Sequence, residues 1–265
     1  MISIKKVNAK HFMTPTKLGD YDFTCNPYVG CENGCLYCYA ATMPDALNRE
    51  VPWGSYVDVR SYPNFNIPKN TGRKSLFFSS MTDCYQPIES NIRLTRKILE
   101  EIYESQLEIS ILTKSHLVTR DIDLFQNMQN LKVGFSISLL DSDATIFEPH
   151  ASKPSQRMEA LKTLKHSGIY TYVFISPIIP FITDVFSILD SVRDYVDEVM
   201  FDTLNLKDTS NKQKMFQVID SKYPHIKMAF HDVFESYHNH YYSDLKEEII
   251  NYVNTHQLKL GYLYK

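Results

Sequence analysis

Short apolar segments rich in β-branched and aromatic residues alternate along the chain with segments whose apolar residues recur at helical spacing. This alternation is typical of βα units in a parallel sheet, because parallel strands need a long crossover that is usually a helix. The pattern predicts six strands, at Tyr21–Cys25, Ser75–Ser80, Leu107–Thr113, Lys132–Ser138, Tyr170–Ser176 and Glu198–Leu204. Because parts of these strands are apolar on both faces, we expect both sides of the sheet to be covered.

Helices are predicted between the strands, at Ile92–Tyr103, Asp121–Met128, Pro154–His166, Asp184–Arg193 and Lys212–Lys222. A further short strand and a helix near Asp244–His256 are predicted in the last part of the chain. The pattern therefore indicates an α/β fold, a partial parallel (β/α)6 barrel with C-terminal additions. A complete eight-unit barrel takes about 250 residues, and the long segment Pro44–Arg73, which is predicted to be irregular, leaves too few residues for one. We predict one domain over residues 1–265, with a core at about 20–225 and the additional elements at about 226–265.

The composition is that of an ordinary globular protein. Hydrophobic residues make up 43% and charged residues 22% of the 265 positions, which excludes a disordered chain. No uninterrupted apolar run of about 18 residues is present, so we expect no membrane span. The first residues lack the apolar core of a signal peptide, which favours a cytoplasmic protein. A formal net charge of −3 argues against a surface built as a whole for nucleic acid, although a local basic groove stays open.

Three of the five cysteines, Cys31, Cys35 and Cys38, lie within eight residues directly after the first predicted strand, at the spacing C-x3-C-x2-C. The Pro27, Gly30 and Asn33-Gly34 positions around them disfavour a regular helix and predict a turn-rich loop. An odd cysteine count with this clustering fits a reducing compartment and a metal or cluster site better than a disulfide framework.

Three interpretations of this loop are open from spacing alone. The cysteines can be small core residues, although a loop with two glycines is rarely core. A zinc site needs a fourth ligand, and the candidates Cys25, His11 and Cys84 lack suitable spacing. A four-iron cluster normally takes four thiolates, so three thiolates leave one iron open to the amine and carboxylate of an amino acid.

The cysteine loop resembles that of the radical S-adenosylmethionine (SAM) superfamily, in which C-x3-C-x2-C follows the first strand of a partial (β/α)6 barrel and an aromatic residue, here Tyr37, precedes the last cysteine. The resemblance extends to the spore photoproduct lyase-like branch, often labelled DNA repair photolyase. It rests on the segments 26–40, 82–89, 113–115 with 120–123, 135–138, 148–149, 154–157 and 177–180, and covers about residues 20–185.

The resemblance implies a [4Fe–4S] cluster on Cys31, Cys35 and Cys38 with SAM bound at its open iron. It also implies that residues following the strands contact SAM, because parallel barrels place their chemistry at the carboxyl ends of strands. The predicted SAM-binding residues are Tyr37, Tyr39, Ser80, Thr82, Asp83, Lys114, Ser136, Ser138, Glu148, Arg157 and Pro177.

The resemblance gives several of these residues a role. Thr82 matches the place where hydroxyls and carbonyls hold the SAM amino group, and Tyr39 and Pro177 are placed against adenine. Lys114 is expected to meet a carboxylate as a point charge. Ser136 and Ser138 share a strand face, and either one hydrogen-bonds SAM or both are packed hydroxyls.

Three further assignments stay open. Arg157 either grips a carboxylate or forms a structural ion pair with Glu148. Lyases of this branch use a cysteine near the end of the second strand as hydrogen donor. The aligned position here is Ser80, and nearby Cys84 is either a shifted donor or a buried thiol.

The sequence thus predicts an enzyme that cleaves SAM reductively and abstracts hydrogen through a 5′-deoxyadenosyl radical. The expected partners are SAM and an electron donor such as flavodoxin or ferredoxin. The candidate substrates are a nucleic-acid lesion, as for a lyase, or a peptide or small molecule. Two other classes stay open, a cluster-bearing accessory protein without its own substrate and a zinc-stabilised nucleic-acid-binding module.

Overall fold

The main sheet has eight strands in the order β11-β10-β9-β8-β7-β6-β3-β2, in a computed structural model that describes residues 2–19, 21–67 and 74–265. Every neighbouring pair is parallel except the short antiparallel pair of β2 with β3. The strands are β2 (Thr14–Pro15), β3 (Phe23–Cys25), β6 (Ser75–Phe78), β7 (Glu108–Thr113), β8 (Leu131–Ser136), β9 (Tyr170–Ile178), β10 (Glu198–Thr203) and β11 (Leu260–Leu263).

The six predicted strands correspond to β3 and β6 to β10, so the prediction of a partial parallel (β/α)6 barrel is confirmed. In the described part of the chain, β2 and β11 form the two edges of the sheet and do not pair with each other, which leaves the barrel open. The division of the chain into a single domain stays a prediction.

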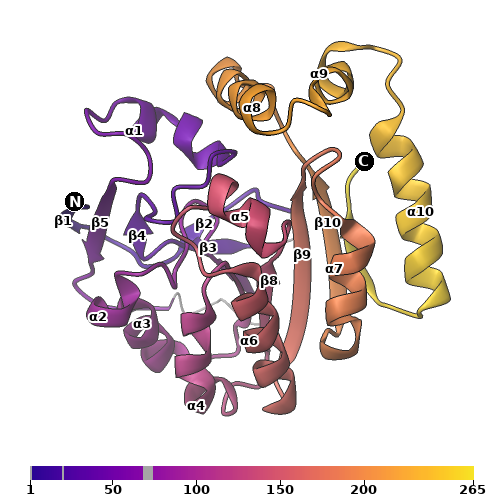
Figure 1. Cartoon of the computed structure of the whole chain (residues 1–265). Helices are drawn as coiled ribbons and strands as arrows, with labels where there is room; N and C mark the ends of the chain where they lie inside the picture. Colours follow the sequence, from indigo (N-terminus) through magenta and orange to yellow (C-terminus); the bar gives the residue numbers. More distant parts are fainter. Residues whose placement is uncertain (1, 20, 68–73) are drawn as a thin grey trace.

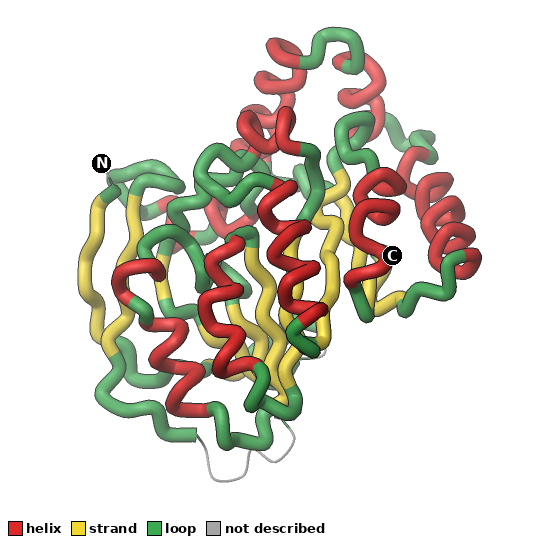
Figure 2. The backbone as a smooth tube through the Cα atoms, turned by 60° about the horizontal axis from the view of Figure 1, so that its bottom comes forward, coloured by secondary structure: helices red, strands yellow, loops and turns green. Residues whose placement is uncertain are grey.

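A row of helices covers one face of this sheet (Figures 1 and 2). The row consists of α2 (Glu89–Ile92), α3 (Leu94–Ile102), the 3-10 turn η2 (His116–Asp121), α4 (Ile122–Phe125), α6 (Pro154–His166) and α7 (Val185–Val192), followed by η3 (Arg193–Tyr195). The apolar residues of α3 recur at helical spacing and are buried, Leu94, Ile98 and Ile102 among them. The helix predicted at 92–103 corresponds to α3. It begins only at Leu94 because Arg93 adopts the left-handed conformation, with φ 53°, and separates α3 from α2.

Side chains from the other face of the strands fill the inside of the open barrel. Tyr172 of β9 hydrogen-bonds the Ser110 hydroxyl at 3.1 Å and donates to the Ile111 carbonyl at 2.9 Å. Its ring lies over Gly134 of β8, where an added Cβ would come within 2.3 Å of ring atoms. The glycine within this strand is therefore explained by the close approach of the tyrosine ring.

A second, three-stranded sheet lies beside the first, in the order β1-β5-β4, and the hydrophobic pattern did not predict it. It contains β1 (Ser3–Asn8), β4 (Tyr28–Val29) and β5 (Tyr56–Ser61). Strand β5 falls in the segment 44–73 predicted to be irregular, of which residues 68–73 lie outside the described part of the chain. Strand β1 escapes prediction because most of its residues are exposed. This sheet supports the cysteine loop, since β4 belongs to that loop.

The remaining helices lie near the carboxyl ends of the strands or after them. They are η1 (Tyr39–Thr42), α1 (Pro44–Leu47), α5 (Asp141–Phe147), α8 (Thr209–Lys222), α9 (Lys227–Glu235) and α10 (Tyr241–Thr255). Figure 1 shows α8 and α9 projecting over the end of the sheet where β10 finishes, whereas α10 packs beside β10 and β11. Within the described residues, no helix combines the length and the apolarity that crossing a membrane requires.

Candidate functional site

Cys31, Cys35 and Cys38 lie together on the turn-rich loop that follows β3, as the sequence predicts. Their thiols are free, with Cys31 buried and the other two half-buried. Burial raises the pKa of Cys31 well above its ordinary value, and Cys35 and Cys38 raise it further because they are close. Burial also raises the pKa of Cys35 to about 12, against the opposing charge of Lys114. The loop therefore gathers three protonated thiols that a metal centre would deprotonate on binding.

The loop is held by the polar side chains that follow β6. Thr82 donates its hydroxyl to the Gly30 carbonyl at 2.6 Å, and Gln86 accepts from the Glu32 amide at 2.8 Å. Gly30 itself has φ 87°, and a Cβ there would come within 2.5 Å of the Tyr56 carbonyl of β5. Only glycine fits a left-handed position with such a close backbone approach.

We expect Gly30→Ala to destabilise the protein by several kcal/mol, because it adds a backbone clash to the left-handed strain. Gly19→Ala is the matched control, since Gly19 also has a positive φ but has nothing within 4 Å of an added Cβ. This control is expected to cost about 1–2 kcal/mol. Urea unfolding of the apo proteins measures both, and equal losses would contradict the role given to the Tyr56 contact.

Asp83 is a buried hub that joins the loop to the ends of β6 and β7. Its carboxylate accepts from the Asn33 side chain at 3.0 Å, the Thr113 hydroxyl at 2.6 Å and the backbone amides of Lys114 and Tyr85 at 2.8 and 2.9 Å. These four donors, two on each oxygen, match the roughly four acceptor positions of a carboxylate. The structure therefore places Asp83 as a support of the cysteine loop.

Glu148 stands at the centre of a second buried network, just after α5. It accepts hydrogen bonds from the Tyr37 hydroxyl and from Arg157, and the Lys114 Nζ lies 3.8 Å away. Burial alone would raise the pKa of Glu148, but the Arg157 and Lys114 charges and these hydrogen bonds lower it below its usual value. The carboxylate is therefore held ionised, and it ties the cysteine loop to β7 and α6.

Lys114 extends from the end of β7 towards the end of β8. Its Nζ donates to the Ser136 hydroxyl at 2.7 Å and lies 5.6 Å from the centre of the Tyr37 ring. The charge also opposes the burial that raises the pKa values of Cys35 and Cys38. Lys114 is thus a partly exposed cation beside two of the three thiols.

Arg157 is fully buried, and each nitrogen of its guanidinium donates within the protein. It binds the Glu148 carboxylate, the Ser136 carbonyl at 2.9 Å and the Ser152 carbonyl at 2.7 Å. Of the two interpretations left open by the sequence, the structure favours the internal ion pair over a grip on a ligand carboxylate. Likewise, the Thr82 hydroxyl is engaged by Gly30 and Gln86.

The other predicted residues lie at the same edge of the sheet. Tyr39 is half-exposed and donates its hydroxyl to the Ser80 carbonyl, while the Ser80 hydroxyl accepts from Asn26 at 2.8 Å. Pro177 lies in the last part of β9 and is half-buried. Cys84 is fully buried in the main hydrophobic core, which favours the interpretation as a packed thiol over that of a hydrogen donor.

Two buried polar atoms have no hydrogen-bond partner within the described residues, the Ser138 hydroxyl after β8 and the Asn211 side-chain oxygen on α8. Ser138 directly precedes Leu139 and Asn211 lies one turn before Met215, and Leu139 and Met215 belong to the second apolar cluster together with Tyr37. An unpaired buried polar atom costs about 1–3 kcal/mol. These atoms are therefore candidates for contact with a bound group at this edge.

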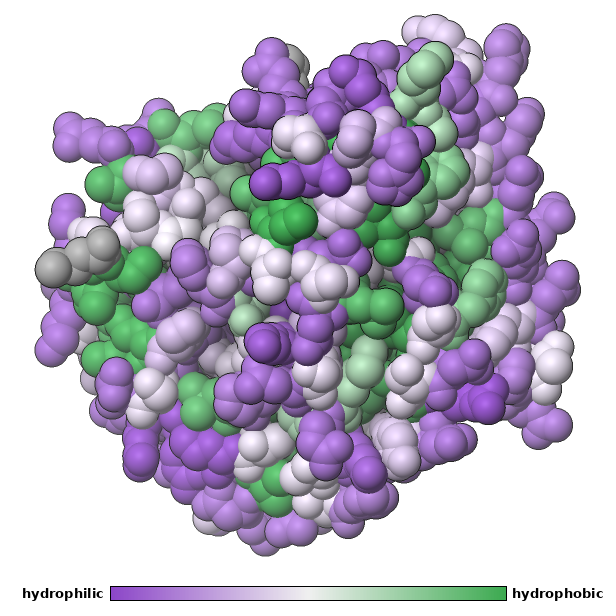
Figure 3. Space-filling model, in the orientation of Figure 1, coloured by the Kyte–Doolittle hydropathy of each residue, from purple (hydrophilic) through white to green (hydrophobic). Residues whose placement is uncertain are grey.

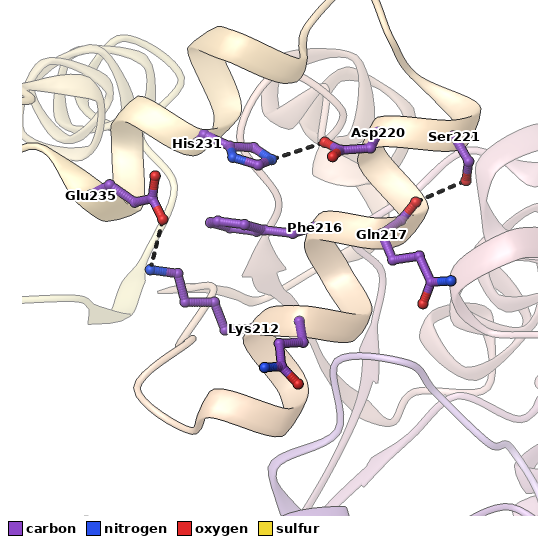
Figure 4. Close-up of a pocket in the computed structure, with 8 residues that line it drawn as sticks. Lys212, Phe216, Gln217, Asp220, Ser221, His231 and Glu235 are labelled. Atoms are coloured by element: carbon purple, nitrogen blue, oxygen red, sulfur yellow. Dashed lines mark hydrogen bonds and ion pairs between the residues drawn. The ribbon is translucent and has the colours of Figure 1, made fainter.

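Apolar surface is exposed beneath α8 and α9 in Figure 3, between hydrophilic patches. A separate open groove of about 690 Å³ lies between these two helices, and none of the residues described above lines it. In Figure 4 the Phe216 ring lies between His231 and Lys212, and each of the groove's charged groups has a partner: His231 contacts Asp220 at 2.9 Å and Lys212 contacts Glu235 at 3.2 Å.

No three His, Cys, Asp or Glu side chains of the described residues converge as ligands of a single metal ion. A zinc site requires such convergence, because its ligands share one ion. In a four-iron cluster each thiolate binds its own iron, so the three thiols lie farther apart than around one ion.

The sequence profile described as "Radical SAM superfamily" matches residues 25–186, more than half of the chain. The chain belongs to the radical SAM superfamily. Membership implies SAM and a [4Fe–4S] cluster. The three free thiols fit the cluster, and the unpaired oxygen of Asn211, whose amide nitrogen binds the Cys38 carbonyl, fits a polar ligand beside it.

This radical SAM protein has relatives over most of its length. It is 40% identical over 211 residues to the uncharacterized protein MJ0683 of Methanocaldococcus jannaschii, covering 78% of this chain and 79% of the relative. It is 26% identical over 160 residues to a "Radical SAM Nalpha-GlyT isomerase" of Pseudomonas phage M6, covering 58% of this chain and 32% of the isomerase. The chain spans about half of an uncharacterized protein of Acidianus two-tailed virus, at 31% identity over 57% of this chain.

Solved structures agree with the fold. A variant of spore photoproduct lyase with bound AdoMet and dinucleoside spore photoproduct superimposes with a TM-score of 0.72 at 14% identity, covering 98% of this chain and 82% of the lyase. SuiB of Streptococcus suis bound to S-adenosylmethionine superimposes with a TM-score of 0.53 at 11% identity, over 91% of this chain and 49% of that protein. At this identity the likeness concerns the fold.

Sequence reasoning missed several residues that the radical SAM protein brings to its site. Asn33 and Gln86 lie inside the recognised segments, but their amides bind neighbouring loops in ways that the local pattern does not encode. Asn211 lies outside residues 25–186 and donates to the Cys38 carbonyl at 3.2 Å. No signal in the sequence connects it to the cysteines.

Proposed function

We propose that this protein is a radical SAM enzyme in which Cys31, Cys35 and Cys38 ligate a [4Fe–4S] cluster, and that it abstracts a hydrogen atom from an organic substrate. The observation that carries the proposal is the gathering of three free thiols on one loop, at the carboxyl end of a parallel sheet. When bound, the cluster would supply the electron that cleaves SAM to methionine and a 5′-deoxyadenosyl radical, which removes the hydrogen atom.

The residues of the chain bind SAM and orient it at the cluster. Lys114 presents a cation beside the cysteines to the carboxylate of SAM, and its Nζ is directed by Ser136. Ser138 offers a buried hydroxyl that nothing else in the described chain uses. Tyr39 and Pro177 lie at the same edge and serve the adenine of SAM, and Ser80 lies beside Tyr39 and accepts a hydrogen bond from its hydroxyl through the backbone carbonyl.

Four residues act by positioning rather than by direct contact. Glu148 and Arg157 form the buried pair that fixes Tyr37 and Lys114, and Asp83 and Thr82 hold the cysteine loop. Because these side chains are locked by internal hydrogen bonds, the site is organised before SAM binds, which reduces the entropy lost on binding.

The test is an anaerobic assay of the reconstituted protein with SAM and dithionite. We expect about four irons per chain and release of 5′-deoxyadenosine. A loaded cluster without 5′-deoxyadenosine would support the accessory-protein class instead. Tightly bound zinc with salt-dependent DNA affinity and no iron would support the zinc module.

The same assay distinguishes substrate classes when UV-damaged DNA and a cell extract are added in separate reactions. A nucleic-acid lesion must leave the base stack to reach a buried radical. Stimulation of 5′-deoxyadenosine release by damaged DNA over undamaged DNA would support repair of such a lesion. Stimulation by the extract alone would end the repair hypothesis, and fractionation would then identify the substrate.

We expect Lys114→Ala to weaken SAM binding about tenfold or more while the cluster is retained, because a charge-assisted contact is lost and the cysteines are not touched. Lys212→Ala, on the surface of α8, is the matched loss of a cation outside the site. Anaerobic equilibrium dialysis with SAM measures both variants. Unchanged SAM affinity in Lys114→Ala would reject the assignment of Lys114.

A further inference from the structure

We infer that Asn211, on α8, is a SAM-binding residue whose side-chain oxygen accepts a hydrogen bond from an N–H or O–H group of the bound SAM. The inference rests on the function proposed above. It assigns a role to a segment that lies outside the residues matched by the superfamily profile.

Helix α8 is fixed where it reaches the cysteine loop. Asp208 caps the helix by accepting from the Ser210 and Asn211 amides at 2.9 and 3.0 Å. One turn further on, Met215 is fully buried in the cluster that also contains Tyr37. The first turn of α8 is therefore ordered by its own cap, and Met215 packs the helix against the cluster that contains Tyr37 of the loop.

The orientation of the Asn211 amide follows from its one protein partner. The Nδ2 group donates to the Cys38 carbonyl at 3.2 Å. A flipped amide would place its oxygen against that carbonyl, and two acceptors repel each other. The nitrogen therefore faces Cys38, and the oxygen lies beside the loop in the same amide plane.

The Asn211 oxygen lacks a donor among the described residues although the side chain is only 3% exposed. Such an acceptor needs a donor to offset its desolvation. Thiolate and sulfide sulfurs are acceptors and do not meet this need. SAM does meet it, because it carries the α-ammonium, two ribose hydroxyls and the adenine amine.

A second buried polar atom without a partner, the Ser138 hydroxyl, supports the same conclusion. Ser138 directly precedes Leu139 after β8, whereas Asn211 lies one turn before Met215 on α8, and Leu139 and Met215 belong to one apolar cluster with Tyr37. These two are the side-chain atoms of the described chain that are buried and unpaired.

The experiment compares SAM binding by anaerobic equilibrium dialysis in reconstituted wild type, Asn211→Leu, Asn211→Asp and Gln213→Ala. Gln213 is an exposed residue on the same helix and serves as the control. We expect about tenfold weaker binding in Asn211→Leu and wild-type binding in Gln213→Ala. Asn211→Asp keeps an acceptor oxygen but loses the donor to Cys38, so it should bind SAM more tightly than Asn211→Leu.

A merely structural tie to Cys38 predicts the opposite order, since aspartate repels the carbonyl that leucine only fails to bind. Asn211→Asp binding SAM no better than Asn211→Leu would overturn the inference, as would unchanged binding in Asn211→Leu. Iron content and the electron paramagnetic resonance signal of the reduced cluster are expected to stay those of wild type. A wild type that takes up no iron or no SAM would refute the proposed function itself.

Methionine and 5′-deoxyadenosine, dialysed separately, identify which donor the oxygen receives. If the donor is the α-ammonium, Asn211→Leu weakens the binding of methionine but not that of 5′-deoxyadenosine. If the donor is on the nucleoside, Asn211→Leu weakens the binding of 5′-deoxyadenosine but not that of methionine. Equal weakening of both fragments would indicate a general distortion and would overturn the inference.

Discussion

Replacing Cys31, Cys35 and Cys38 together with alanine is expected to remove nearly all iron and sulfide from the reconstituted protein and to abolish SAM cleavage. The three thiols are free and lie on one loop, so no disulfide is lost with them. Because each thiolate binds a separate iron, any single replacement should also leave the cluster labile. Iron and sulfide assays after anaerobic reconstitution measure the effect.

Cys84→Ala is the matched control, since Cys84 is a free thiol outside the loop that is buried in the main core. Its loss is expected to cost about 0.5–3 kcal/mol of stability, as a buried truncation does, without reducing the iron content. Full iron retention in the triple variant would refute the cluster assignment. Loss of iron in the Cys84 variant alone would transfer the site to that residue.

Glu148→Gln is expected to lower the free energy of unfolding by about 3–5 kcal/mol, because it leaves the fully buried Arg157 without its counter-charge. That is a large part of the total stability of a typical domain, about 5–15 kcal/mol. Glu100→Gln is the control, because Glu100 pairs with Arg96 on the surface and should contribute under about 1 kcal/mol. Urea unfolding of the apo proteins gives both values.

The difference in free energy of unfolding between wild type and Glu148→Gln should be larger at neutral pH than in acid. The pKa of Glu148 is lowered in the folded protein, so its ionised form stabilises the fold above the unfolded-state pKa of about 4.3. As the pH falls below that value and towards the folded pKa, this stabilisation is lost. Wild type and Glu148→Gln should therefore differ most near neutral pH and converge in acid. A difference that stays constant would contradict the assignment of the effect to the carboxylate charge.

Local patterns in the sequence were sufficient for the barrel strands and the cysteine loop. Apolar strands and the turn residues around Cys31, Cys35 and Cys38 act over a few positions, so their structure follows from nearby residues. The helix at 154–166 is reproduced with the same bounds, because Pro154 at its start and regular spacing define it locally. The parallel order of the strands follows from the alternation of strand and helix.

The partners of the polar side chains at the site were decided only by the tertiary structure. From the sequence, Arg157 could bind either a ligand carboxylate or Glu148. In the structure α6 packs against β8, the guanidinium is completely buried, and it pairs with Glu148. Strand β5 forms by pairing with β1, which lies about fifty residues earlier in the chain, so no local pattern predicts it. Asn211 reaches Cys38 across 173 positions of the chain. Hydrophobic periodicity determines which face of an element is buried, but a hydrogen bond between distant segments depends on how the whole sheet curls and where α8 then lies.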